Sequence, residues 1–356
     1  MSGRSSPYEG LPASAFWRSG VVGQDPAAIA GLYRKKFEIA RTTQVATAGS
    51  CFAQHIARNL TARGFCVLDM EPAPPGLSEE SAARFGFGLF SARYANIYTA
   101  RQLRQVVEEA RGRFAVAEPI WERDGRYFDA MRPSVEPGGL PTPDLVRDHR
   151  DYHLKRVQLL LQKAELFVFT LGLTETWMHT ETGTVYPTAP GTIAGRHDPG
   201  VYSFKNFTAQ DVYDDLRAFF ALAREFNPKM RFLLTVSPVP LTATASGEHV
   251  LSATVYSKSV LRAVAGQLYH EDPDVDYFPS YEIITGALAR GAYFEDNLRS
   301  VSADGVAAAM SNFFAEHDPG GAPKAEPAVK PQPRRARKKT KEDIVCEDIL
   351  LEAFSE

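Results

Sequence analysis

The chain has 356 residues, of which 44% are hydrophobic and 11% aromatic, enough to bury a sizeable core. At about 150 residues per domain, this length allows two domains or one large α/β domain with extensions. The composition excludes a wholly disordered chain, a collagen and a coiled coil. With 40 basic and 43 acidic residues the formal net charge is -3, so the chain lacks the overall positive charge that favours nucleic-acid binding.

The N-terminal segment, residues 1–20, lacks the basic start and the apolar run of a secretory signal. No later segment approaches the roughly 20 apolar residues that span a bilayer. We therefore expect a cytoplasmic protein with no membrane span.

Cysteine and histidine spacing predicts neither a disulfide framework nor a metal site. Cys51, Cys66 and Cys346 are too few and too scattered for a framework, and no pair has C-x-x-C spacing. His149 and His153 are four residues apart, but no glutamate stands where an H-E-x-x-H motif needs one. Neither a Walker loop nor a G-x-G-x-x-G after a strand is present, so no cofactor is expected.

Predicted strands and helices alternate along the chain. The first helix has apolar residues at Phe52, Ile56 and Leu60, which lie on one face of an α-helix. This alternation predicts an α/β fold, a three-layer flavodoxin-like parallel sheet with helices on both faces. In chain order the first expected elements are a strand at 45–48, a helix that begins at 52 and is capped by Gly64, and a strand at 65–68. They are followed by a helix from about 151, a strand at 166–171, a helix at 211–226, a strand at 232–236, a helix at 250–269, a strand at 275–278 and a helix at 303–314.

The regular pattern has a flanking arm and two irregular stretches. Residues 1–44 carry aromatic residues and proline without a strong period, and we expect them to form an arm packed on the domain at 45–315. The stretches at 71–150 and 180–207 are rich in turn residues. They are either lids or binding loops, or ordinary surface excursions.

Polar and small residues follow four of the predicted strands. In open α/β sheets, ligands bind at the carboxyl ends of the strands, so these residues outline a candidate site. The residues after the first, third, fourth and fifth strands include Gly49, Ser50 and Cys51; Gly172, Thr174 and Glu175; Ser237; and Glu282.

The turn after the first strand has two interpretations. Ser50 and Cys51 stand at the N-terminus of a helix, where the N–H groups and the dipole stabilise negative charge. Such a position favours a thiolate, which makes Cys51 a candidate nucleophile. The alternative is that Ser50 is a helix N-cap and Cys51 a small buried residue.

Four blocks of the sequence resemble the GSCFA family. The first, Ala48–Ala53, contains the five letters that name the family, and Leu171–Trp177, Ser237–Leu241 and Tyr277–Glu282 are similar to its later blocks in the expected order. The resemblance implies a relationship to the SGNH (GDSL-like) hydrolases and the PC-esterases. It therefore implies a flavodoxin-like sheet and ester chemistry on carbohydrate or lipid substrates.

The resemblance also suggests roles for individual residues. In the wider superfamily the nucleophile is the serine of Gly-Asp-Ser, so here either Cys51 takes its place or the neighbouring Ser50 attacks. In that superfamily the oxyanion hole has three donors: a backbone N–H at the nucleophile, a glycine from the superfamily's own second conserved block, and an asparagine. Here Gly86 or Gly88 takes the place of that glycine, and Thr174 takes the place of the asparagine. A threonine hydroxyl can still donate one hydrogen bond.

The largest departure from the superfamily is at its Asp-x-x-His motif. The matching residues are Asp296 and Arg299, and arginine stays protonated and cannot act as a base. His249 is the best replacement and His179 the second, unless both are loop histidines with no catalytic role. Arg299 either binds a carboxylate or phosphate of an anionic substrate, or pairs with Asp296 or Glu295.

The composition changes after the last predicted helix. Residues 316–341 form a Pro/Ala-rich and then basic linker, with seven basic residues and no acid from Lys330 to Lys341. Residues 342–356 contain six acids and no base, and their apolar residues recur with a helical period. This acidic amphipathic helix either docks on a partner protein or remains a solvated tail. Because the basic run lacks aromatic residues, specific nucleic-acid binding is not expected.

Two functions fit these observations. The first is an SGNH-like esterase or acyltransferase that acts on an ester of a carbohydrate or similar polar substrate, with Ser50 or Cys51 as nucleophile, His249 as base and Asp296 as its acidic partner. The alternative is a non-catalytic protein that binds a glycan or anionic ligand in the same crevice, while its tail recruits a partner protein.

Overall fold

The computed structural model describes residues 6–26, 29, 31–320, 351 and 354. The linker predicted at 316–341 and the acidic helix predicted at 342–356 lie almost entirely outside the described residues. Within the described part, no helix has the length and apolar character needed to cross a bilayer.

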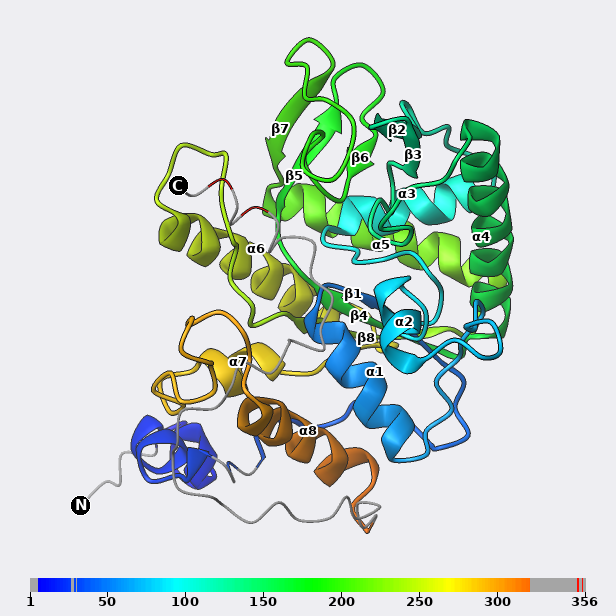
Figure 1. Cartoon of the computed structure of the whole chain (residues 1–356). Helices are drawn as coiled ribbons and strands as arrows, with labels where there is room; N and C mark the ends of the chain where they lie inside the picture. Colours follow the sequence, from blue (N-terminus) through cyan, green and yellow to red (C-terminus); the bar gives the residue numbers. More distant parts are fainter. Residues whose placement is uncertain (1–5, 27–28, 30, 321–350, 352–353, 355–356) are drawn as a thin grey trace, which may run out of the picture.

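A parallel sheet of four strands forms the centre of the described chain, in the order β1-β4-β8-β9 (Figure 1). Its strands are β1 (Val45–Gly49), β4 (Leu166–Leu171), β8 (Arg231–Val236) and β9 (Val275–Tyr277). They are mostly apolar and almost wholly buried, as expected of strands covered on both faces.

The strand predicted at 65–68 is reduced to a single bridge, between Val67 and Val45. The segment leaves β1 there because the N–H of Cys66 donates to the carbonyl of Arg41, and that of Met70 to Ser91. With this segment counted, the strand order becomes 2-1-3-4-5, the flavodoxin-like order. The predicted α/β fold class is confirmed.

One face of the sheet is covered by α1 (Phe52–Ala62), α7 (Ser280–Thr285) and α8 (Ala303–His317) (Figure 1). Successive side chains of a strand point to opposite faces. Leu166 and Val168 of β4 therefore share one core with the apolar sides of these helices.

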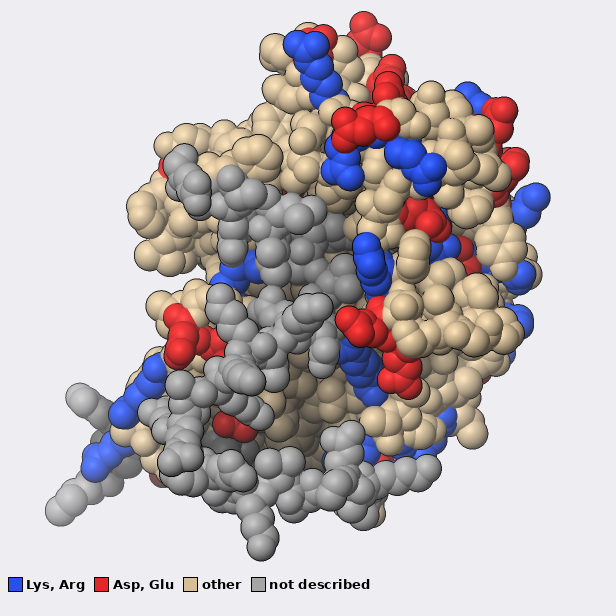
Figure 2. Space-filling view, in the orientation of Figure 1, with Lys and Arg blue, Asp and Glu red and all other residues tan. Residues whose placement is uncertain are grey.

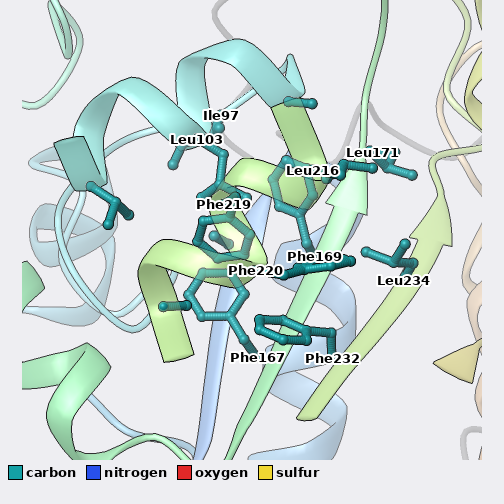
Figure 3. Packing of buried hydrophobic residues seen from close by; sticks show 14 of the residues in the cluster. Ile97, Leu103, Phe167, Phe169, Leu171, Leu216, Phe219, Phe220, Phe232 and Leu234 are labelled. Carbon is teal, nitrogen blue, oxygen red and sulfur yellow. The ribbon is translucent and has the colours of Figure 1, made fainter. Parts of the chain in front are cut away.

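The opposite face is covered by α3 (Ala100–Ala110), α4 (Pro143–Lys163), α5 (Ala209–Phe226) and α6 (Val250–Glu271). These helices enclose the larger of the two cores, which gives the molecule its third layer. Figure 3 shows its centre, where Phe167, Phe169 and Leu171 lie among Leu216, Phe219, Phe220, Phe232 and Leu234.

The stretch at 71–150 is more regular than predicted. It contains α2 (Glu79–Arg84), the whole of α3, and a hairpin of β2 (Ile120–Arg123) and β3 (Arg126–Asp129). The turn residues Asp124 and Gly125 both have positive φ angles, 53° and 71°, as a two-residue hairpin turn requires.

A second sheet stands above the carboxyl end of β4. Its strands are β5 (Glu175–His179), β6 (Val185–Tyr186) and β7 (Tyr202–Asn206), antiparallel in the order β6-β5-β7. Trp121 of the hairpin stacks on Tyr186 of this sheet, with ring centroids 5.3 Å apart. The two irregular stretches therefore pack against each other.

The N-terminal segment begins with two short exposed turns, η1 (Ala13–Ala15) and η2 (Arg18–Val22). Further along, Tyr33 is buried, and its hydroxyl donates to Asp276 Oδ2 at 2.9 Å and contacts His317 Nε2 at 2.8 Å. His317 Nδ1 accepts a backbone N–H at 3.3 Å, so Nε2 carries the ring proton. This chain of bonds joins the segment to β9 and α8.

Candidate functional site

Ser50 lies at the carboxyl end of β1, directly before α1. The preceding Gly49 has a φ of 139°, and a Cβ there would lie 2.5 Å from the carbonyl oxygen of Thr170, so no larger residue fits. The Ser50 N–H donates to the same carbonyl at 3.2 Å. Its side chain is 4% exposed, and its Oγ makes no hydrogen bond with any described residue.

A small pocket surrounds this hydroxyl, with a cavity volume of ≈ 10 Å³. It combines the ends of β1, β4 and β8 with one side of α6, so the structure brings together part of the set expected from the strand ends. Cys51 also lines the pocket, and its sulfur takes part in a disulfide. The lining includes Ser50, Cys51, Tyr98, Gly172, Ser237 and Lys258.

Gly172 places the turn after β4 against Ser50. A Cβ on Gly172 would lie 3.0 Å from the Cβ of Ser50 and 2.9 Å from the carbonyl oxygen of Tyr98. Its N–H donates to that carbonyl at 3.2 Å. The close approach of three backbone segments requires glycine at this position.

Lys258 is a pocket residue that the sequence analysis missed. It lies in the middle of α6, is 2% exposed, and donates from Nζ to the carbonyl oxygen of Gly172 at 2.5 Å. The neighbouring Ser257 accepts the N–H of Thr174 at 2.9 Å. The signal in the sequence is the position of Lys258 beside the apolar stripe that includes Ala253 and Leu261. A lysine at such a position is seldom buried unless it has a partner or a role.

The oxyanion donors expected from the resemblance lie elsewhere. The Thr174 hydroxyl donates to Asn206 Oδ1 at 2.6 Å, and Thr174 is not among the described residues that line the pocket. Gly86 packs against Val135, and Gly88 is exposed.

Farther along the chain than Gly86 and Gly88, Tyr98 lines the pocket. The N–H of Ile97 donates to the carbonyl oxygen of Gly49 at 2.9 Å. This segment came into view only with the structure, since its contacts are made by backbone atoms.

The histidine proposed as a base caps a helix instead. His249 is exposed and its Nδ1 accepts the N–H of Leu251 at 3.1 Å, at the start of α6. It stands nine positions before Lys258, about 13 Å along the helix. His179, at the end of β5, accepts the N–H of Thr182 at 3.4 Å. No histidine is among the described residues that line the pocket.

The segment matched to Asp-x-x-His forms a turn away from the pocket. Asp296 is exposed, and the N–H of Arg299 donates to Asn297 Oδ1 at 2.9 Å. Neither Asp296 nor Arg299 is among the described pocket residues.

The two glutamates expected at strand ends hold neighbouring elements together. Glu175 accepts the Thr244 hydroxyl at 2.7 Å, which ties the loop before α6 to β5, and burial raises the pKa of Glu175. Glu282 accepts the Tyr277 hydroxyl at 2.8 Å and pairs with Arg262.

Ser237, by contrast, is a pocket residue, and its N–H donates to the carbonyl oxygen of Leu171 at 2.8 Å.

The histidine pair on α4 is split between two environments. His153 is 1% exposed and its Nδ1 lies 2.6 Å from Glu71 Oε2, whereas His149 faces outward beside Glu136. Across the residues that the structure describes, no three His, Cys, Asp or Glu side chains are placed to hold a metal ion.

Figure 2 shows basic and acidic side chains interspersed on one face of the molecule, with few charges over the loop before α6.

Comparison with known proteins places this fold in a family. Two solved structures are similar at low identity: a carbohydrate esterase family 3 protein from Talaromyces cellulolyticus (11% identity, TM-score 0.35) and a serine-to-alanine mutant of an acetyl esterase with acetate ion (11% identity, TM-score 0.33). Each alignment covers 77% of this chain and 96% of the other. No curated protein matches. The GSCFA family profile matches residues 44–313, most of the chain, and the protein therefore belongs to the GSCFA family.

Proposed function

We propose that this protein is an esterase or acyltransferase that acts on an ester of a carbohydrate or a similar polar substrate, with Ser50 as the nucleophile. One observation carries the proposal: a buried hydroxyl without a hydrogen-bond partner among the described residues, at the carboxyl end of a strand and in a pocket. Other buried polar atoms of the described chain also lack a partner, and what distinguishes Ser50 is its place at a pocket where the parallel strands end, which is where ligands of open α/β sheets bind.

Ser50 is favoured over Cys51 by the state of the sulfur. Cys51 lies in a disulfide, and a sulfur in that state is not a thiolate. The Ser50 hydroxyl carries no such bond, and Ser50 lines the same pocket.

The N-terminus of α1 lies where it stabilises the negative charge that forms during ester cleavage. Attack of Ser50 Oγ on an ester carbonyl carbon gives a tetrahedral intermediate with a negative oxygen. The helix begins at Phe52, and the N–H groups and the dipole of its first turn stabilise negative charge at this place.

The test is turnover on a panel of acetylated sugars and aryl acetates, with butyrate esters for comparison. We expect Ser50→Ala to lower kcat/KM by a factor on the order of 10³ or more, because the nucleophile is lost. Cys51→Ala and Ser237→Ala, which alter the same pocket, are the matched controls and should stay within about tenfold of wild type. Equal turnover by wild type and Ser50→Ala would remove this mechanism.

A binding function without catalysis is the second candidate. It is favoured because no histidine, and neither Asp296 nor Arg299, is among the described residues that line the pocket. Its expected result is saturable binding of a glycan in a calorimetric titration, with no turnover of any ester in the panel. Recruitment of a partner by residues 342–356 is a separate prediction, tested by pull-down with and without them.

A further inference from the structure

We propose that Lys258 is the proton acceptor for Ser50, so that a serine–lysine pair performs the task that histidine has in the wider superfamily. The inference rests on the proposed ester chemistry and names the base that this chemistry lacks. Its first support is position: the Lys258 side chain, 2% exposed, lines the same pocket as Ser50.

The backbone of Gly172 links Lys258 to Ser50. Its carbonyl oxygen accepts from Lys258 Nζ at 2.5 Å, and its Cα is so close to Ser50 that an added Cβ would lie 3.0 Å from the serine Cβ. One residue therefore contacts both partners. Nζ and Oγ are not hydrogen-bonded in this structure, and such bonds commonly form only when substrate is bound.

The other titratable groups of the pocket are poorer candidates for a base. Of the described lining residues, Cys51, Tyr98 and Lys258 carry groups that titrate. The sulfur of Cys51 is in a disulfide. The charged groups nearest along α6 and α7, Arg262 and Glu282, are paired with each other. Tyr98 is distinguished by the experiment below.

The proton transfers balance without a co-reactant other than water. The neutral amine of Lys258 takes the Ser50 proton as Oγ bonds to the ester carbonyl carbon. The resulting ammonium gives that proton to the leaving alcohol as the ester C–O bond breaks and acyl-Ser50 forms. Water then loses a proton to the amine and attacks the acyl group, and the carboxylic acid departs as Ser50 regains its proton. Lysine serves as a base where burial favours its neutral form.

A purely structural role for Lys258 makes different predictions. With Ser257, Lys258 holds the turn at 172–174 against α6 through two hydrogen bonds. If that were its whole function, Ser257→Ala and Lys258→Ala would have similar effects, and neither would respond to an added base.

The experiment is chemical rescue of Lys258→Ala by primary amines in the full-length protein. We expect the variant to lose kcat/KM by a factor on the order of 10³, and amines to restore part of it, more strongly as their basicity rises. Ser257→Ala, the matched control, should keep most of the activity and show no response to amines. Tyr98→Phe tests the tyrosine as the base, and a loss of activity as large as that of Lys258→Ala would overturn the assignment of Lys258. The Ser50→Ala/Lys258→Ala double variant should not respond, which excludes direct aminolysis of the ester.

A second measurement covers the case in which Lys258→Ala does not fold. Lys258→Met retains the length of the side chain, and labelling of Ser50 by a fluorophosphonate, followed by mass spectrometry, reports the nucleophile directly. We expect labelling to slow at least tenfold relative to wild type, with an unchanged melting temperature.

The outcomes separate the two proposals. If wild type has no esterase activity and Ser50 is not labelled, the proposed function fails. If wild type is active and Ser50→Ala is not, the ester chemistry stands. The assignment of Lys258 is then overturned if Lys258→Ala stays within about threefold of wild type, or if it loses activity and does not respond to amines.

Discussion

At the scale of single residues, Gly49 has the tightest surroundings at the site. A Cβ there would meet three atoms of Thr170 within 2.8 Å, two of them backbone atoms of the neighbouring strand. Those atoms cannot retreat without breaking the parallel pairing of β1 with β4. The glycine therefore determines where the next residue, Ser50, leaves the sheet.

We predict that Gly49→Ala lowers the free energy of unfolding by about 3 kcal/mol or more, from backbone strain together with overpacking. Gly64→Ala is the matched control, because Gly64 also has a positive φ, 79°, but no atom within 4 Å of an added Cβ. Its cost should be about 1 kcal/mol. Urea unfolding measures both, and equal losses would show that the contact with Thr170 is not the cause.

At the scale of secondary-structure elements, the sequence identifies strand ends better than helix faces. Ser50, Gly172 and Ser237 were predictable as neighbours because each follows an apolar run, and parallel strands end at one edge of a sheet. Lys258 reaches the pocket from the middle of α6. Which turn of that helix packs against the strand ends depends on tertiary packing, and no local sequence pattern reveals it. His249 was misleading for a related reason, since a polar residue at a helix start is often a cap.

The loop before α6 allows a prediction at this scale. Thr244→Val removes the hydrogen bond to Glu175, and a bond to a charged acceptor is worth about 2 kcal/mol. It also removes the two bonds of the same hydroxyl with Ser246, inside the loop. We expect faster amide hydrogen exchange at residues 238–248, with no change in β8. Thr242→Val is the control, because the buried hydroxyl of Thr242 makes no hydrogen bond with a described residue. Equal exchange in both variants would mean that Glu175 does not hold the loop.

At the scale of the whole molecule, three histidines on different helices are held neutral. Burial is the main cause that lowers the pKa of His55 on α1, His153 on α4 and His317 on α8, each to about 4. An unfolded histidine has a pKa near 6.5, so the unfolded chain binds more protons between pH 6.5 and 4. Stability is therefore lost as pH falls through this window.

We predict that the free energy of unfolding decreases between pH 7.5 and pH 5, by about 2 kcal/mol for each of these histidines. In His317→Gln the decrease should be smaller by that amount, whatever the variant does to stability at pH 7.5. Guanidinium unfolding at the two pH values measures the difference, and identical decreases in wild type and His317→Gln would contradict the assignment.

The bonds that join Tyr33 to Asp276 and His317 also have a kinetic consequence. Their partners are separated by 243 and 284 positions in the sequence, and contacts between distant positions form late and slow the folding of a chain. On the ribosome, Tyr33 emerges long before β9 and α8 exist to receive it. Tyr33 therefore cannot make these bonds until synthesis has passed α8.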